Sequence, residues 1–167
     1  MRKNSKLLGV LFVIYIILLI WIIMFRLSFS ISSIHRVREI NLIPFNYGVV
    51  HAGDIPIFET LLNILIFLPF GIYLKMFGFD NKKIVFTGFW VSLLFEVSQY
   101  IFRLGSSDIT DIIANTLGMV VGIFLYFIFR KIFKNDDRVN KIFLVLATIV
   151  SVIMVVFFFW LLIGSIA

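Results

Sequence analysis

The chain has no cysteine, and charged residues are scarce in it. The lack of cysteine excludes disulfide bonds, thiolate metal sites and a cysteine nucleophile. Charged residues make up 14% of the 167 residues, whereas soluble domains contain about 25%. Hydrophobic residues make up 62%, and the mean hydropathy is +1.11. Because each helical span needs about 20 residues, this composition predicts an integral membrane protein with no room for a separate soluble domain.

Five long apolar runs are separated by short charged segments. They cover about residues 7–25, 57–76, 84–102, 108–129 and 142–166. The first run follows a basic N-terminus, as in a signal peptide, but it is too long for one and lacks a convincing cleavage site. We therefore predict an all-α fold, a polytopic membrane bundle of about five transmembrane helices that forms one domain over residues 1–167.

The basic residues favour one orientation of this bundle. If the N-terminus is cytoplasmic, the inner segments hold eleven of the fifteen Lys and Arg residues. The outer segments then hold Arg26, Arg36, Arg38 and Arg103. Because Lys and Arg accumulate on the cytoplasmic side of membrane proteins, we predict a cytoplasmic N-terminus and an external C-terminus. Topology and lipid headgroups explain the net charge of +6, so no nucleic-acid partner is expected.

Polar side chains form a stripe on each of two neighbouring spans. At about 100° per residue, one face of the third span carries Ser92, Glu96, Gln99 and Arg103, and one face of the fourth carries Asp108, Asp111, Asn115, Gly118 and Gly122. The second span adds Glu59 and Asn63, one turn apart. An ionisable group inside the membrane costs about 2.5–3.5 kcal/mol on insertion scales, so Glu96 needs a partner. The pattern predicts a polar pocket open to the outside, with several carboxylates around the guanidinium of Arg103.

Several roles remain open for these polar groups. They could simply hold the helices together, and the GxxxG spacing of Gly118 and Gly122 favours close helix packing. Oxygen ligands from Glu96, Asp108 and Asp111 would suit Mg²⁺ or Ca²⁺, although no cofactor is certain. Glu96 and Asp111 are also candidates for a general acid and base.

An ordered set of motifs resembles the VanZ-like family. The set runs from about residue 41 to residue 122 and consists of "NLIPF" at 41–45, "NILIFLPFG" at 63–71 and the polar positions of the third and fourth spans. The resemblance implies a small protein of the bacterial plasma membrane linked to resistance to teicoplanin, a lipid-bearing glycopeptide antibiotic. It implies characteristic polar positions at Asn63, Glu96, Gln99, Arg103, Asp108, Asp111 and Asn115, but no settled catalytic role.

The leading hypothesis is an envelope protein whose outer pocket binds a lipid-linked cell-wall intermediate or the lipoglycopeptide itself. Candidate ligand-binding residues are Glu59, Asn63, Glu96, Gln99, Arg103, Asp108, Asp111, Asn115 and, in the long outer loop, Arg36 and Arg38. The alternatives are a membrane enzyme acting on a polyprenyl-phosphate-type lipid, a small proton-coupled transporter and an envelope scaffold. Membrane lipids are the expected partners, and the oligomeric state is left open.

Overall fold

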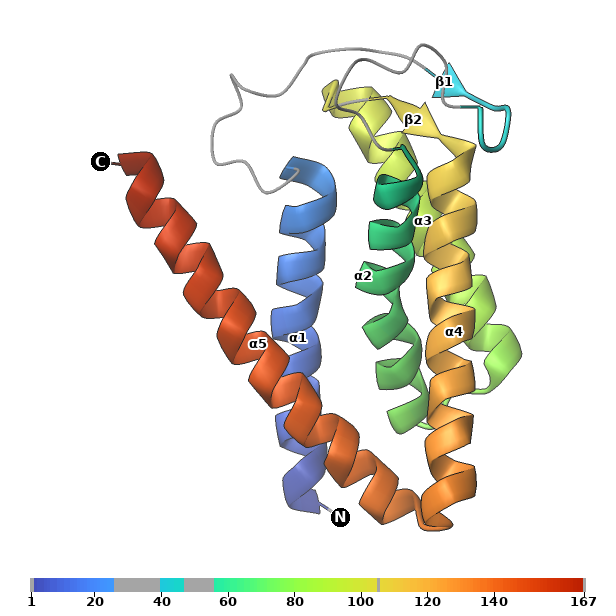
Figure 1. The fold of residues 1–167 in the computed structure, drawn as a ribbon, viewed down its shortest axis with the longest axis vertical. Helices are drawn as coiled ribbons and strands as arrows, with labels where there is room; N and C mark the ends of the chain where they lie inside the picture. Colours follow the sequence, from blue (N-terminus) through green and yellow to red (C-terminus); the bar gives the residue numbers. More distant parts are fainter. Residues whose placement is uncertain (1, 26–39, 47–55, 105, 167) are drawn as a thin grey trace. The chain divides into compact units, whose positions relative to one another are not determined.

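The computed structural model describes residues 2–25, 40–46, 56–104 and 106–166, and this part of the chain contains five long α-helices (Figure 1). They are α1 (Arg2–Phe25), α2 (Pro56–Met76), α3 (Asn81–Phe102), α4 (Ile109–Phe133) and α5 (Asp136–Ile166). Each helix is long and apolar enough to cross a membrane. The predicted all-α fold with five candidate spans is confirmed, and the orientation of the termini stays a prediction.

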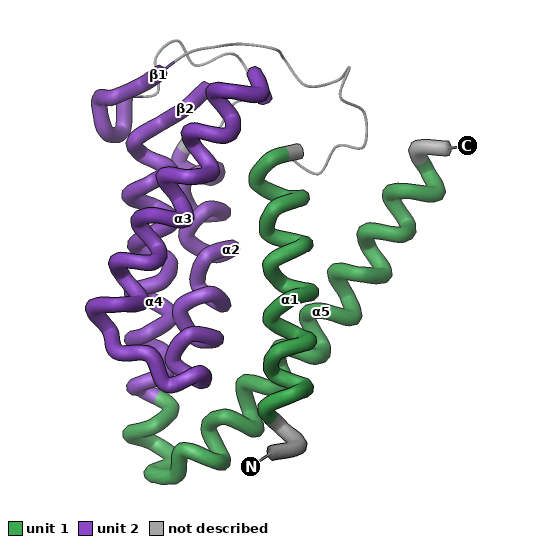
Figure 2. Tube along the Cα trace, turned by 180° about the vertical axis from the view of Figure 1, so that it is seen from behind, with its two compact units in different colours: residues 1–34, 129–167 green, residues 35–128 purple. Residues whose placement is uncertain are grey.

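The chain forms two compact units (Figure 2). The first consists of residues 1–34 and 129–167, and the second of residues 35–128. In the first unit α1 contacts α5, and the rings of Trp21 and Phe158 meet edge to face with their centroids 4.8 Å apart. An ion pair of 2.7 Å between Arg130 Nε and Asp136 Oδ1 spans the turn that leads into α5. The candidate polar residues that the structure describes all belong to the second unit.

In the second unit, α2 and α4 approach each other closely at glycine. A methyl group at Gly118 would collide with the carbonyl oxygen of Ile64, and one at Gly122 would collide with that of Leu68. Both carbonyl groups belong to α2, and they lie one turn apart. A helix backbone can come this near only where its neighbour has no Cβ. The predicted packing role of the GxxxG motif is confirmed.

The helix α3 has a defined cap at each end. At its start, the carboxylate of Asp80 accepts a hydrogen bond of 2.9 Å from the backbone N–H of Lys83. This bond holds the pKa of Asp80 below its ordinary value. At its end, Arg103 adopts the left-handed conformation (φ 58°, ψ 44°), and the N–H of Leu104 bonds to the carbonyl of Gln99 at 2.9 Å. This left-handed turn ends the helix, and only a short connection separates α3 from the next helix.

Two short strands form a contact that the sequence did not predict. The strand β1 (Ile40–Asn41) pairs in parallel with β2 (Ser107–Asp108), so Asn41 lies beside Asp108. A strand of two residues is too short to show the alternating hydrophobic pattern by which strands are recognised. The pairing places the "NLIPF" segment against the N-terminus of α4.

Candidate functional site

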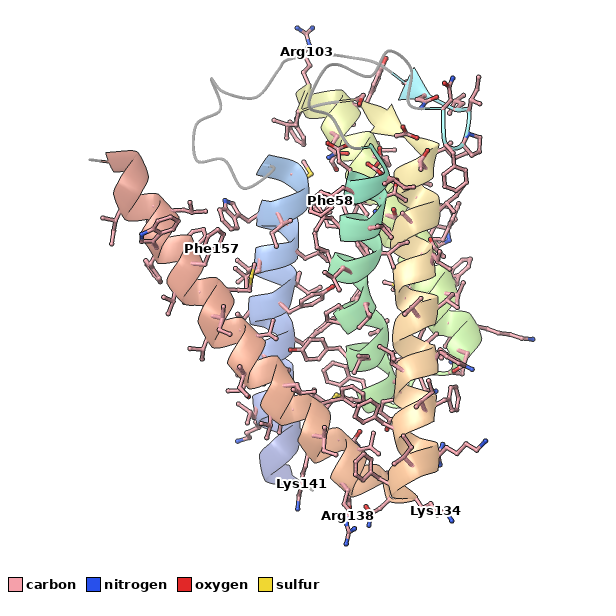
Figure 3. The ribbon with its side chains drawn as sticks, viewed as in Figure 1. Phe58, Arg103, Lys134, Arg138, Lys141 and Phe157 are labelled. Atoms are coloured by element: carbon pink, nitrogen blue, oxygen red, sulfur yellow. The ribbon has the colours of Figure 1, made fainter. Side chains whose placement is uncertain are left out.

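Polar side chains from the strands and from α2, α3 and α4 gather where α4 begins (Figure 3). We refer to this group as the polar cluster; its members are Asn41, Asn63, Ser92, Glu96, Asp108, Thr110, Asp111 and Asn115. Ser92, Glu96 and Asn115 are buried, as the two predicted stripes require. Gln99 is buried on the same face of α3. The helical-wheel prediction is therefore confirmed for these inward-facing residues.

Two carboxylates of the polar cluster accept hydrogen bonds from the start of α4. Glu96 Oε2 accepts a bond of 2.8 Å from the N–H of Asp108. Asp108 Oδ1 in turn accepts one of 2.7 Å from the N–H of Thr110. The first N–H groups of a helix have no partner within the helix and lie at the positive end of its dipole. Glu96 and Asp108 therefore supply both the acceptors and the negative charge that this helix end favours.

Three asparagine side chains connect the segments that meet in the polar cluster. Their Nδ2 groups donate to Asp108 from Asn41 (2.9 Å), to Asp111 from Asn63 (2.7 Å) and to Ser92 from Asn115 (2.8 Å). These bonds join β1 to β2, α2 to α4, and α4 to α3. The polar cluster thus holds the elements of the second unit together, and it fixes the positions of the side chains around it.

The prediction that Arg103 is the shared cation of the carboxylates is wrong. Its side chain is exposed and points away from α3 and α4 (Figure 3), and no ion pair joins it to a carboxylate of the described residues. The helical wheel assumed that α3 continues through position 103, whereas the chain leaves the helix there in a left-handed turn. Glu59 is exposed in the first turn of α2. Arg36 and Arg38 lie outside the described residues.

The described residues give no support to a metal site at Glu96, Asp108 and Asp111. Nowhere in that part of the chain do three His, Cys, Asp or Glu side chains lie close enough together to hold an ion. The carboxylates instead bind amide donors, and Asp111 accepts its bond from Asn63. General acid–base roles for Glu96 and Asp111 stay predictions.

An apolar groove of about 780 Å³ lies between α3 and α4, beside the polar cluster. Its walls are Phe89, Leu93, Val97 and Tyr100 of α3 and Ile109, Ile112, Ile113, Thr116, Leu117 and Val120 of α4. Ile40, Asn41, Leu42, Glu96, Ser107 and Asp108 line it as well, so it is polar only toward the cluster. From Phe89 to Tyr100 the groove extends about 16 Å at about 1.5 Å per residue, roughly half the hydrocarbon thickness of a bilayer.

One polar atom on the groove wall lacks a partner. The hydroxyl oxygen of Thr116 is buried and has no hydrogen bond within the described structure. A buried polar group without a partner is destabilising, so such a group needs an explanation. Sequence reasoning did not single out Thr116, because one threonine in an apolar run has no distinguishing pattern.

Sequence reasoning also missed Asn41 and Thr110. Asn41 was quoted only as part of a motif, and its partner is 67 positions further along the chain. For Thr110 the sequence did contain a usable pattern. Asp108 and Asp111 are spaced like the N-cap and N3 positions of a capping box, which predicts that Asp108 caps α4 and accepts the N–H of a residue in its first turn, as it does from Thr110.

Comparison with known proteins identifies the family. The family model described as VanZ/LLP1 matches residues 12–130, which extends into α1 and therefore beyond the motifs at 41–122. The chain is 33% identical over 153 residues to Protein VanZ of Enterococcus faecium, and the match covers 88% of this chain and 89% of the relative. No solved structure matches the chain. Both the extent of the family match and the identity to this relative show that the chain belongs to the VanZ/LLP1 family.

Proposed function

We propose that the chain is a teicoplanin-resistance-type protein of the bacterial plasma membrane, and that its groove between α3 and α4 binds the hydrocarbon chain of a lipid-bearing ligand. Membership of the VanZ/LLP1 family supports the envelope role. The observation that carries the ligand class is the groove itself, with an almost wholly apolar surface along two candidate spans and carboxylate side chains at one end. Ligand pockets of about 300–1,000 Å³ with this distribution of polarity are typical of small-molecule sites.

The polar end of the groove favours one kind of headgroup. Glu96 and Asp108 place carboxylates there, and no basic residue lines the groove in the described part of the chain. A carboxylate attracts amide or ammonium donors and repels a phosphate. The groove therefore suits an acyl chain joined to an amide-rich head, as in a lipoglycopeptide, better than a polyprenyl phosphate.

A groove-filling substitution tests the proposal. Leu117→Trp places an indole in the groove, whereas Leu94→Trp makes the same change at an exposed position of α3 outside the groove. In a teicoplanin-susceptible host, we expect the natural chain and Leu94→Trp to lower susceptibility several-fold, and Leu117→Trp to have no effect at equal protein level. If Leu117→Trp protected the host fully, the groove would not be the functional site.

Native mass spectrometry of the purified protein distinguishes the two ligand sources. We expect teicoplanin to remain bound to the natural chain and to Leu94→Trp, but not to Leu117→Trp. Teicoplanin without its acyl chain should bind to none of them. Preferential retention of a polyprenyl phosphate would contradict the assignment of a lipoglycopeptide and reassign the groove to a cell-wall intermediate.

A further inference from the structure

The six residues from Asn41 to Asn46 form a tight turn that exposes large apolar side chains. Leu42 is 71% exposed, Ile43 62% and Phe45 56%. The position between Ile43 and Phe45 is Pro44, so four consecutive apolar residues occupy the tip. Such a patch on a protein surface marks a contact with a partner or with a membrane.

Several backbone groups of this turn form hydrogen bonds within it. The N–H of Ile43 donates to Asn41 Oδ1 at 3.2 Å, and the N–H of Asn46 donates to the carbonyl of Ile43 at 3.2 Å. The side chain of Asn41 also donates to the carbonyl of Asn46 at 2.7 Å. Pro44 has no N–H to satisfy.

A further bond fixes the turn to the first turn of α4. The N–H of Phe45 donates to the hydroxyl of Thr110 at 3.0 Å. Every backbone N–H from Ile43 to Asn46 therefore has a protein acceptor. Thr110 lies at the beginning of a candidate membrane span, and exposed apolar side chains follow on α4 at Ile113 and Leu117. The turn thus lies beside the first residues of this candidate span.

We infer that the Asn41–Asn46 turn is a membrane wedge, whose apolar tip inserts into the lipid at the boundary between headgroups and hydrocarbon. Irregular backbone tolerates a water-poor environment better when its polar groups have protein partners, and every N–H group from Ile43 to Asn46 has one. Ile40 and Leu42 also line the apolar groove, so one lipid-compatible surface continues from the turn onto α3 and α4. The occupant of the exposed patch is bilayer lipid, and not a second protein.

Spin labelling in proteoliposomes tests this inference, and the natural absence of cysteine makes single labels straightforward. Ile43→Cys and Leu42→Cys place a nitroxide on the tip, and both leave the backbone N–H bonds of the turn available. Asn135→Cys is the control, at an exposed polar position between α4 and α5. Accessibility is measured with oxygen, which concentrates in hydrocarbon, and with a water-soluble nickel chelate.

We expect the ratio of oxygen to nickel accessibility to be several-fold higher at positions 42 and 43 than at position 135. Equal ratios at all three positions would place the tip in water and overturn the inference. Low accessibility to both reagents at the tip would also overturn it, because a protein surface would then cover the patch. The readout involves no antibiotic, so its outcome is independent of whether the groove binds teicoplanin.

Discussion

At the scale of single residues, the acidic side chains have a different role from the predicted one. Glu96 is buried and ionisable, and such a group is costly inside a membrane. Its carboxylate accepts the N–H of Asp108 at the positive end of α4, and a charge in that position gains about 0.3–1 kcal/mol, up to about 2 when partly buried. The acceptor and the charge are separate contributions, so two substitutions can separate them.

Glu96→Gln and Glu96→Leu should therefore differ in stability. Gln keeps an acceptor for the N–H of Asp108, and Leu leaves that group unpartnered at a cost of about 1–3 kcal/mol. We expect thermal unfolding in detergent to show a marked loss for Leu and a small one for Gln. Equal losses would show that charge, and not hydrogen bonding, is what this position requires.

Thr116→Val should preserve or raise stability. Valine has nearly the shape of threonine without the hydroxyl, which is buried and unpartnered here. Removing such a group is neutral or stabilising. We expect an unchanged or higher melting temperature for thermal unfolding in detergent. A marked loss of stability would contradict an unpartnered hydroxyl at this position.

At the scale of helices, the sequence predicts what depends on local periodicity. Apolar runs located the five helices, with ends up to six residues from the observed ones, and the helical wheel identified Ser92, Glu96 and Asn115 as inward-facing. The same wheel failed for Arg103, because the helix ends there. The docking of Asn41 on the start of α4 was not predictable, since contacts between distant segments leave no local period. The apolar groove was not predicted for the same reason, because it exists only once α3 and α4 are packed together.

The contact between α2 and α4 should be sensitive to a single methyl group. In Gly118→Ala the added Cβ meets the backbone carbonyl of Ile64, which cannot rotate away. We expect a loss of about 1–3 kcal/mol, as in other overpacked cores, measured by thermal unfolding in detergent. Gly9→Ala on α1 is the matched control, because nothing lies within 4 Å of its added Cβ. A neutral Gly118→Ala would mean that the two backbones do not touch.

The cap of α3 should depend on pH through Asp80. Its pKa is lowered because the N–H of Lys83 bonds to the carboxylate, so the ionised form stabilises the folded state. That stabilisation is fully present above the ordinary pKa of an aspartate and is lost as the pH falls through the lowered value. Asp80→Asn keeps an acceptor that does not titrate. We expect the melting temperature of the natural chain to fall more than that of Asp80→Asn between about pH 6 and pH 3. Melting temperatures that fell equally in the two proteins would contradict a lowered pKa of Asp80.

At the scale of the whole molecule, the orientation predicted from charge agrees with the proposed function. The polar cluster, the polar end of the groove and the wedge all lie where α3 ends and α4 begins. The distribution of eleven inner and four outer basic residues predicts that this end of the spans faces the outside. A lipid-bearing ligand that arrives from outside the cell would then meet the groove at its polar end.

Labelling of intact cells tests this orientation. Ser106→Cys lies between α3 and α4 on the predicted outer side, and Asn135→Cys lies between α4 and α5 on the predicted inner side. Because the natural chain has no cysteine, a membrane-impermeant maleimide should react with Ser106→Cys in whole cells and with Asn135→Cys only after the membrane is opened. The reverse labelling pattern would show that the protein has the opposite orientation in the membrane. It would place the groove's polar end in the cytoplasm, where an external antibiotic has no direct route to it, and the proposed mode of action would then be excluded.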